Sequence, residues 1–412
     1  MPLLYSRRTA PQDSPAAWAR LAAALAAASV ACVGGWTVVV ALPMVEQEFG
    51  SARAGASFPY ACAMVGFAFG TVWMGRLSDR YGVVLPIWLS AALLAAGYGL
   101  SGLAPSLMVF ALAHVLVGFG ASAGFAPLIA DLSHWFTARR GLAVVIVAAG
   151  NYLAGALWPP LLQAASEAYG WRAAHIGTGL LAAAFLVPVS FLFRIRPQLH
   201  AVGRAAAGVE AARAALGLSP RALQALLTLA GFSCCMAMAM PQVHIVAYCG
   251  DLGYGVARGA QMLSLMLTLG IVSRLLSGAA SDRFGGVAVL LVGSFMQAVA
   301  LFLYLFFDGL SSLFLISGIF GLFQGGIIPM YAVIVREFLP PQEAGARIGV
   351  VTASTIVGMA VGGWAAGWIH DLSGTYRLAF IHGIVWNAVN LAIVAYLFIA
   401  PRAAARAARP AL

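Results

Sequence analysis

The chain has 412 residues, of which 62% are hydrophobic and only 9% are charged, and its formal net charge is +10. Soluble domains contain roughly 45–50% apolar and about 25% charged residues, so this composition excludes an ordinary soluble protein. The basic excess does not indicate nucleic-acid binding, because the 23 basic residues are all arginines and 22 of them are spread over loops, tails and span ends without a basic face.

Long apolar stretches follow one another along the chain, and each can cross a bilayer, which takes about 20 residues. Residues 21–45, for example, contain 25 positions without a charge, which is longer than the apolar segment of a secretory signal. We therefore predict an all-α integral membrane protein with twelve transmembrane helices. The expected spans are 18–43, 54–77, 83–103, 106–131, 140–166, 171–193, 222–249, 257–281, 286–307, 311–337, 346–369 and 376–399.

The arginines predict the orientation of these spans. If the N-terminus is cytoplasmic, 18 arginines lie on the cytoplasmic side and 4 on the other, which is the bias of inner-membrane proteins. Both termini are then cytoplasmic. We predict a cytoplasmic N-terminal tail (1–17), a first six-helix bundle (18–193), a cytoplasmic linker (194–221), a second six-helix bundle (222–399) and a cytoplasmic C-terminal tail (400–412). The linker is either a solvated spacer or an amphipathic helix on the inner leaflet.

One loop occurs twice. Residues 75–82 read GRLSDRYG and residues 278–285 read GAASDRFG, an offset of 203 positions. A second, looser echo places Arg172 and Arg377 at an offset of 205. The chain is therefore expected to consist of two pseudo-symmetric six-helix halves.

The repeated loop must reverse the chain within a few residues at the cytoplasmic surface. We expect Gly75 and Gly82 to allow close backbone approach and a strained turn. Asp79 is expected just before the third span, where its carboxylate can accept from free backbone N–H groups. Such a cap, together with cytoplasmic anchoring, explains the motif without any role in transport. The alternative is an inner gate whose charges separate during transport. Its members would be Gly75, Asp79, Arg80, Gly82, Arg139, Asp282 and Arg283.

Arg274 lies inside the eighth span, seven uncharged residues before Asp282. A central arginine costs about 2.5–3.5 kcal/mol on insertion scales. The acidic residues map to loops, tails or helix ends, which leaves one cation at membrane depth without a carboxylate partner. Either its side chain extends to the cytoplasmic end and bonds backbone carbonyls or Asp282, or its planar fork binds a carboxylate substrate.

Twelve spans in two halves, with G-x-x-x-D-R-x-G after the second and eighth, resemble the major facilitator superfamily over nearly the whole chain. Four stretches look like its bacterial monocarboxylate and oxalate/formate transporter branch. They are GGWTVVVALPMVEQEFG, HWFTARRGLAVVIVAAGNYLAG, PQVHIVAYCGDLGYG and GWIHDLSGTY. The resemblance implies a secondary active transporter of a small organic anion.

In that branch an arginine of the eighth helix is the charge partner of the substrate, and Arg274 matches its position. Animal monocarboxylate transporters carry a proton on an aspartate four residues earlier, where this chain has Gly270. Coupling by proton symport or by anion exchange therefore stays open. Oxalate transporters add a lysine in the eleventh helix, where this chain has Ser354. One buried cation matches one carboxylate, so we expect a monocarboxylate.

Other polar residues inside the spans are candidates for the same cavity. His244 follows Pro241 in the seventh span and can titrate near neutral pH. A lone intramembrane histidine is otherwise commonly an interhelical hydrogen-bonding residue. Tyr331 follows GGIIP, which loosens the tenth span, and is otherwise an interfacial aromatic residue. The substrate-binding candidates are Asn151, Tyr152, Gln242, His244, Arg274, Gln324 and Tyr331, and the proton-coupling candidates are His114, His244 and His382.

Two other classes of protein were weighed. A membrane enzyme needs a nucleophile with a base or a metal cluster, and the sequence contains no H-E-x-x-H and no clustered His/Asp pair at membrane depth. An exporter of drugs or other neutral or cationic compounds is the stronger alternative, since a fold does not fix a substrate. We expect a chain that works as a monomer in the lipid bilayer, without a cofactor or a metal ion.

Overall fold

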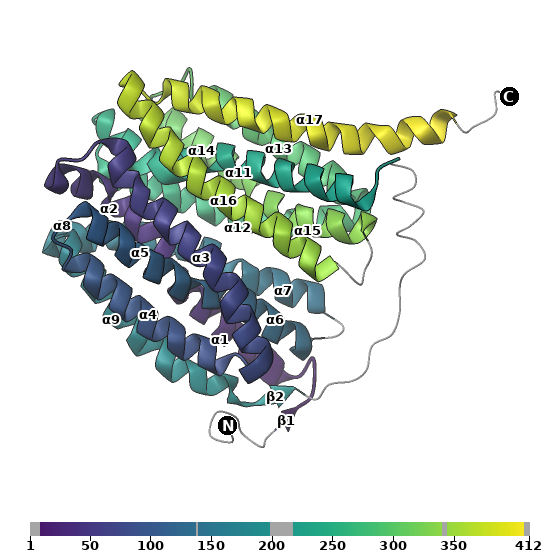
Figure 1. Ribbon diagram of the computed structural model, residues 1–412, viewed down its shortest axis with the longest axis horizontal. Helices are drawn as coiled ribbons and strands as arrows, with labels where there is room; N and C mark the ends of the chain where they lie inside the picture. Colours follow the sequence, from purple (N-terminus) through teal and green to yellow (C-terminus); the bar gives the residue numbers. More distant parts are fainter. Residues whose placement is uncertain (1–8, 137–138, 198–216, 340–343, 408–412) are drawn as a thin grey trace. The chain divides into compact units, whose positions relative to one another are not determined.

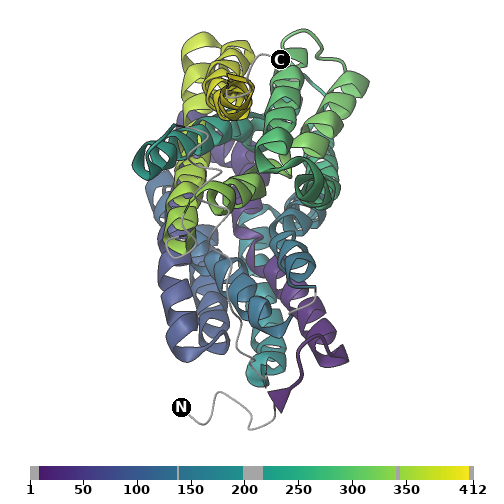
Figure 2. The same cartoon turned by 90° about the vertical axis from the view of Figure 1, so that its right-hand side faces the viewer.

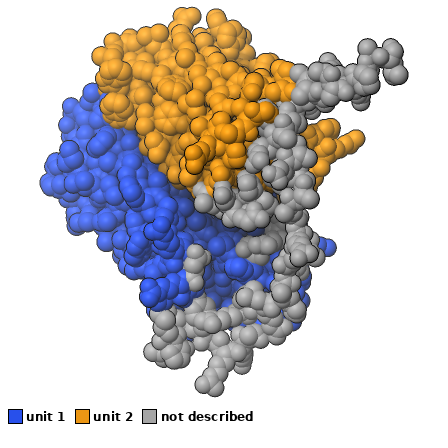
Figure 3. All heavy atoms as spheres, turned by 45° about the vertical axis from the view of Figure 1, so that its right-hand side comes forward, with its two compact units in different colours: residues 1–201, 243–268 blue, residues 202–242, 269–412 orange. Residues whose placement is uncertain are grey.

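The computed structural model describes residues 9–136, 139–197, 217–339 and 344–407. Within them, twelve helical segments are long and apolar enough to cross a membrane, as the sequence predicts. The chain divides into two compact units, shown in blue and orange in Figure 3. Unit 1 comprises residues 1–201 and 243–268, and unit 2 comprises residues 202–242 and 269–412. This division differs from the expected six-helix halves, because residues 243–268 cluster with the first half.

Unit 1 contains helices α1 to α9, drawn from purple to teal in Figure 1 and Figure 2, together with one end each of α11 and α12. Helix α4 packs between α5 and α9, and α3 lies along α5. The elements are β1 Thr9–Ala10, α1 Pro15–Ala31, α2 Gly34–Phe49, α3 Arg53–Tyr81, α4 Val84–Gly102, α5 Leu107–Ala121, η1 Ser122–Gly124, α6 Ala126–Trp135, α7 Arg140–Ala148, α8 Gly150–Tyr169, α9 Trp171–Ser190, η2 Phe191–Arg194 and β2 Arg196–Pro197.

The first, fourth and fifth spans are each interrupted once, between α1 and α2, around η1, and between α7 and α8. Irregular backbone is tolerated at membrane depth only where protein or a water-filled cavity surrounds it. These interruptions were not expected from the apolar pattern, because hydropathy alone does not register a local break.

A buried arginine ties the helices of unit 1 together near one end. Arg20 of α1 is 4% exposed and forms a two-pronged ion pair with Asp131 of α6, at 2.7 Å for each nitrogen–oxygen contact. Its guanidinium also donates to the backbone carbonyl oxygens of Leu192, Phe193 and Ile195. The charge is therefore compensated where it is removed from water. Arg53 is also buried, so Arg274 is not the only buried cation, contrary to the sequence-based expectation.

Unit 2 contains the remaining helices. Helix α13 lies against α14, α15 and α17, and α16 lies against α15 and α17. Helices α11 and α12 cross the boundary between the units, at residues 242/243 and 268/269. The elements are α11 Pro220–Asp251, α12 Val256–Phe284, α13 Gly286–Leu303, α14 Leu310–Gln324, α15 Ile327–Phe338, α16 Ala344–Ser373 and α17 Arg377–Ala407.

The predicted tails and linker are only partly described. Residues 198–216 of the expected linker, residues 1–8 of the N-terminal tail and residues 408–412 of the C-terminal tail lie outside the described residues. Thr9 and Ala10 of β1 pair in parallel with Arg196 and Pro197 of β2. Because β2 follows α9 and η2, this pairing holds the start of the described chain next to the segment after α9. Helix α17 continues to Ala407, beyond the expected start of the C-terminal tail at residue 400.

Candidate functional site

Arg274 lies in α12, within unit 2, and only 5% of its surface is exposed. Its Nε donates a hydrogen bond to the backbone carbonyl oxygen of Gly325, at 3.2 Å. Gly325 is the C-cap of α14, which ends at Gln324, and α15 begins only at Ile327. The C-terminal end of a helix carries partial negative charge and unpaired carbonyls, so it stabilises a nearby cation. The interrupted tenth span therefore offers the buried guanidinium a backbone carbonyl at the end of a helix.

Two glycines bring the interruption close enough to α12 for this contact. A Cβ added at Gly325 would lie 2.0 Å from the carbonyl oxygen of Gly270, and one added at Gly326 would lie 1.9 Å from Ser277 Oγ. Only glycine fits where two backbones approach so closely. The Gly326 amide also donates to Ser273 Oγ at 3.2 Å. Gly325 and Gly326, expected to loosen the tenth span, thus position its backbone beside Arg274.

Two more predicted substrate residues meet next to this point. Gln242 of α11 donates from Nε2 to Oε1 of Gln324, the residue that precedes Gly325. Both side chains are buried. Nε2 of Gln324 has no hydrogen-bond partner within the described parts of the chain. A buried amide N–H group without a hydrogen-bond acceptor in the protein is expected to bind water or a ligand.

Tyr331 belongs to a different polar cluster of unit 2. Its hydroxyl donates to Asn390 Oδ1 at 2.7 Å, and Asn390 Nδ2 donates to Ser294 Oγ at 2.8 Å. Asn387 donates to the backbone carbonyl of Ser294 at 2.8 Å, and both asparagines are fully buried. Asn387 and Asn390 were not among the residues predicted from the sequence, although two asparagines three residues apart inside an apolar span are a detectable signal. Hydrogen bonds between protein groups thus join α13, α15 and α17 at this cluster.

The predicted histidines occupy three different surroundings. His244 is fully buried in the part of α11 that belongs to unit 1. Nδ1 of the fully buried His114 lies 2.8 Å from the Phe110 carbonyl, and its ring centroid lies 5.8 Å from that of His175, a buried histidine that the sequence analysis overlooked. His382 is half-buried in α17 and accepts from Trp386 Nε1 at 2.9 Å.

Asn151 and Tyr152 lie in α8, in unit 1. The backbone carbonyl of Asn151 accepts from Trp36 Nε1 at 3.3 Å, and Tyr152 is 4% exposed. The structure thus joins Gln242 to Gln324, the residue before the Gly325 carbonyl that Arg274 contacts. It pairs Tyr331 with Asn390 and places the other candidates outside α17 in unit 1.

The first repeated loop differs from the expectation in two respects. Helix α3 continues to Tyr81, so Asp79 lies inside that helix and not at the start of the next one, and the N-cap of α4 receives no side-chain hydrogen bond. The side chain of Asp79 lies outside the described residues. Gly82 has φ +80°, as the expected turn requires, whereas no other part of the described chain closely approaches Gly75.

The arginines expected to pair with Asp79 lie over aromatic rings. The Arg80 guanidinium is 5.2 Å from the ring of Tyr81, and that of Arg139 is 5.8 Å from the ring of Trp18. Both residues are exposed. An ion pair between either of them and Asp79 stays a prediction.

The second repeated loop is held by a residue that the sequence analysis overlooked. Asp282 and Arg283 are exposed in the last turn of α12, and Gly285 has φ +81°. The amide of Gly286, at the start of α13, donates to Oε1 of Glu337 at 2.9 Å. Glu337 lies at the end of α15, so the cap comes from another helix and not from the motif's own aspartate.

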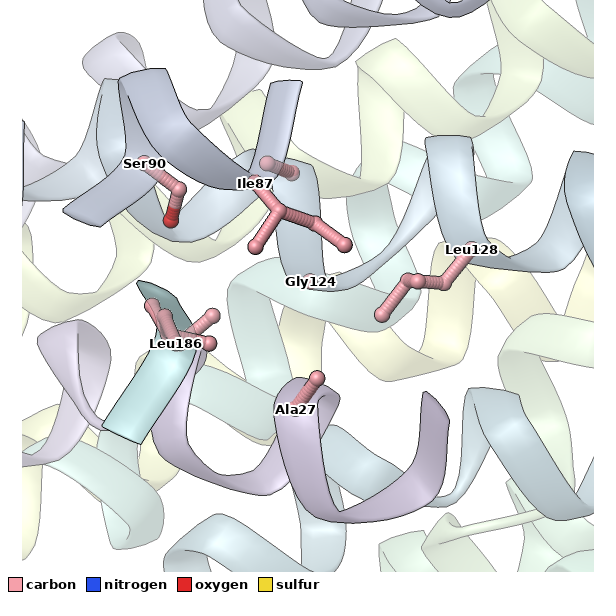
Figure 4. A pocket seen from close by; sticks show the side chains of 8 residues that line it. Ala27, Ile87, Ser90, Gly124, Leu128 and Leu186 are labelled. Carbon is pink, nitrogen blue, oxygen red and sulfur yellow. The ribbon is translucent and has the colours of Figure 1, made fainter. Parts of the chain in front are cut away.

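Unit 1 also contains a small apolar gap (Figure 4). It lies among α1, α4, η1, α6 and α9, and its lining includes Ile87, Leu128 and Leu186. The hydroxyl of Ser90, the polar side chain in this lining, donates to the Gly120 carbonyl at 2.8 Å. None of the predicted substrate residues lines it. Its apolar walls and satisfied hydroxyl are typical of imperfect packing.

Within the described residues, twelve helices long and apolar enough to cross a membrane, a twice-occurring loop and a buried cation at a broken helix are typical of a multi-pass membrane transporter. The sequence model of the Major Facilitator Superfamily matches residues 24–320 and 271–411. The chain belongs to this family, as its motifs predict.

Similar proteins carry names that indicate different transported compounds. The chain is 26% identical to monocarboxylate transporter 13 of Bos taurus over 325 residues, covering 77% of this chain and 75% of the relative. It is 24% identical to the aspyridones efflux protein of Emericella nidulans over 307 residues, covering 72% and 61% respectively. A crystal structure of a bacterial homologue of the human lysosomal transporter Spinster has a TM-score of 0.69 at 14% identity, covering 97% of this chain and 100% of that one. This last likeness confirms the fold.

Proposed function

We propose that this transporter carries a small monocarboxylate, such as a short-chain or 2-hydroxy acid, across the cytoplasmic membrane by alternating access. The observation that carries the proposal is the burial of Arg274 at 5% exposure beside the end of α14, inside a helix that spans the membrane. Keeping a cation there is costly. A function that requires a permanent positive charge explains its presence, and binding a carboxylate is such a function.

Gln324 supports the same conclusion. Its buried Nε2 is an N–H donor, and its backbone is continuous with the carbonyl that receives Arg274. A carboxylate accepts hydrogen bonds and never donates them when ionised, so a guanidinium with a neighbouring amide suits its two oxygens. We propose that Arg274 holds the charge of the substrate and that Gln324, oriented by Gln242, donates a second bond.

The charge count favours a monoanion over a dianion. Ser354, at the position aligned with the second cation of oxalate transporters, is neutral, and its hydroxyl lies 3.0 Å from the Thr228 carbonyl oxygen and 2.7 Å from that of Val351. A second carboxylate at this site would lose its hydration without gaining a cation. Oxalate and malonate should therefore bind more weakly than lactate, pyruvate or butyrate.

The other residues selected from the sequence are assigned to the same function. We assign Asn151, Tyr152 and His244 to substrate binding, His114, His244 and His382 to candidate proton transfer, and Tyr331 to support through Asn390. Transport is coupled either to proton symport or to exchange for a second anion. The repeated loops, with Gly75, Asp79, Arg80, Gly82, Arg139, Asp282 and Arg283, form the inner gate, and the chain works as a monomer with both termini in the cytoplasm.

Competition for uptake tests the substrate class. Purified protein is reconstituted into liposomes, uptake of labelled lactate is measured, and unlabelled monocarboxylates, dicarboxylates, sugars and cationic drugs are added in turn. A thermal-shift screen of the same panel reports binding without transport. Stabilisation and inhibition by monocarboxylates alone support the proposal, and stronger inhibition by oxalate or malonate would overturn it.

Export of a larger organic compound is the second candidate. It is supported by the 24% identity to a fungal efflux protein over 72% of the chain. The same panel separates the two functions, because an exporter of neutral or cationic compounds responds to those compounds and is indifferent to short carboxylates.

A further inference from the structure

The ends of α11 and α12 that the arginine distribution places outside the cell belong to unit 1. Residues 243–268, which join these two helices, cluster with residues 1–201 (blue in Figure 3), whereas the remainder of both helices belongs to unit 2. The second half of the sequence therefore contributes a hairpin tip to the first-half bundle. We call residues 243–268 the α11–α12 tip.

An ion cluster attaches this tip to the first two spans. Arg53, at the start of α3, has a side chain that is only 8% exposed, and it lies between two carboxylates. Its Nε is 2.7 Å from Glu46 of α2, and its Nη2 donates to Asp251 of the tip at 3.0 Å. One guanidinium thus joins two acidic groups that would otherwise repel each other.

Two uncharged contacts reinforce the attachment further along the tip. The hydroxyl of Ser264 donates to the backbone carbonyl of Ala156 in α8. Leu267 packs against the Gly155 backbone, where an added Cβ would lie 2.2 Å from Leu267 Cδ1. The tip therefore rests on α3 at one point and on α8 at another.

The repeat shows that the Arg53 contact is not a simple copy of the first half. Asp251 stands 203 positions after Glu48, the same offset as the repeated loops. Glu48 pairs with Arg172, at the start of α9, at 2.7 Å, which keeps it within the first-half bundle. Asp251 instead pairs with Arg53, which belongs to the other half of the sequence. These two carboxylates occupy equivalent positions in the repeat and form different ion pairs. Glu48 stabilises the first-half bundle, and Asp251 joins the two halves of the sequence.

We infer that Arg53 is an outer latch, which holds the α11–α12 tip on α2 and α3 and must release Asp251 whenever the external side of the transporter opens. In a carrier that works by alternating access, the halves separate at one side of the membrane and then at the other. The tip contacts form across the halves at the predicted external side, so they stabilise the state that is closed there. The inference rests on transport by alternating access and is independent of the substrate.

The test measures the tip directly in substrate-free protein. Spin labels are placed at exposed positions 103, after α4, and 254, between α11 and α12, in a background without the five native cysteines. Asp251→Asn removes one partner of the latch and leaves Arg53 paired with Glu46. We expect the long-distance population to rise by about two- to fivefold relative to the short one, as for a partly exposed ion pair.

Glu48→Gln is the matched control, because it breaks an ion pair at the same end of the same unit without touching the tip. It should leave the distance distribution unchanged. Equal distributions in the parent and Asp251→Asn proteins, or equal shifts in Asp251→Asn and Glu48→Gln, would overturn the latch.

A second measurement needs no purified protein. A cysteine is introduced at position 264, where the native serine donates to the Ala156 carbonyl. Intact cells are then treated with a membrane-impermeant maleimide. Alkylation should be about two- to fivefold faster with Asp251→Asn than with Glu48→Gln, by the same change in population. Equal rates would contradict the inference. Because neither readout uses a substrate, a failed latch leaves the monocarboxylate proposal standing, and the reverse also holds.

Discussion

Arg274 donates from Nε to the carbonyl oxygen of Gly325, the C-cap of α14, over 3.2 Å. The charge, which has no acidic residue near it in the sequence, is thus stabilised by the end of a helix 51 positions away. The contact places the guanidinium at the break in the tenth span, and the residue before Gly325 is Gln324, which accepts from Gln242.

Replacing Arg274 with glutamine should preserve folding and remove transport. The variant inserts more readily, because the buried charge is gone. Losing charge-assisted bonds of about 1.5–3 kcal/mol should weaken binding roughly 10- to 100-fold. Arg274→Lys should also fail, since a point charge cannot reproduce the planar fork. Uptake and thermal-shift titration with a monocarboxylate measure both effects.

The control for this prediction is Arg258→Gln in the same helix, where the exposed guanidinium donates to Gln261. It should transport normally. Normal uptake by Arg274→Gln would show that this arginine serves only the packing of α12 against α14.

Gly325→Ala should damage the site through the backbone. Its Cβ would meet the Gly270 carbonyl at 2.0 Å, which forces α14 and α12 apart at a cost of about 1–3 kcal/mol. We expect a lower melting temperature and weaker monocarboxylate binding. Gly278→Ala, in α12 and facing open space, should change neither quantity. Parent-like binding by Gly325→Ala would mean that the Arg274 contact is dispensable.

Tyr331→Phe should lower stability and change substrate affinity little. Removing the hydroxyl leaves Asn390 Oδ1 without its 2.7 Å donor in a fully buried setting, which costs about 1–3 kcal/mol. The matched change Tyr396→Phe, at an exposed tyrosine of α17, should be neutral. Thermal unfolding and saturation of uptake separate the two effects. A large loss of affinity at parental stability would place the Tyr331 hydroxyl on the substrate instead.

Glu337→Ala should loosen the second repeated loop. The substitution removes the acceptor of the Gly286 amide at the start of α13, and loss of a helix cap costs about 0.5–2 kcal/mol. The exposed Asp282, changed to alanine, serves as the control. The expected result is faster proteolysis at residues 282–286 in the Glu337 variant alone. Faster cleavage in the Asp282 variant would return the capping role to the motif.

Cysteine labelling tests the orientation of the whole chain. In a cysteine-free variant, a cysteine at position 204 should be inaccessible to an impermeant reagent in intact cells, because the 18-to-4 arginine bias places it inside. A cysteine at position 103 should be labelled. External labelling at position 204 would invert the topology and with it the side of the proposed latch.

The sequence by itself determined the class of this protein. Three features of short segments were enough: apolar stretches of membrane length, a loop repeated after 203 positions and an arginine bias. These features do not depend on how the helices pack. Twelve spans, family membership and the Gly82 turn followed from them. Arg274 stood out for the same reason, since a charge inside an apolar stretch is costly whatever surrounds it.

The tertiary structure decided which groups accompany those residues. The Gly325 carbonyl reaches Arg274 from 51 positions away, Glu337 caps α13 from α15, and Asp251 meets Arg53 across 198 positions. Hydrogen bonds and ion pairs act over about 3–4 Å, so they depend on how helices pack, which hydropathy does not encode. Asp79 illustrates the limit, because one additional helical turn in α3 moved it out of the position where a cap would form.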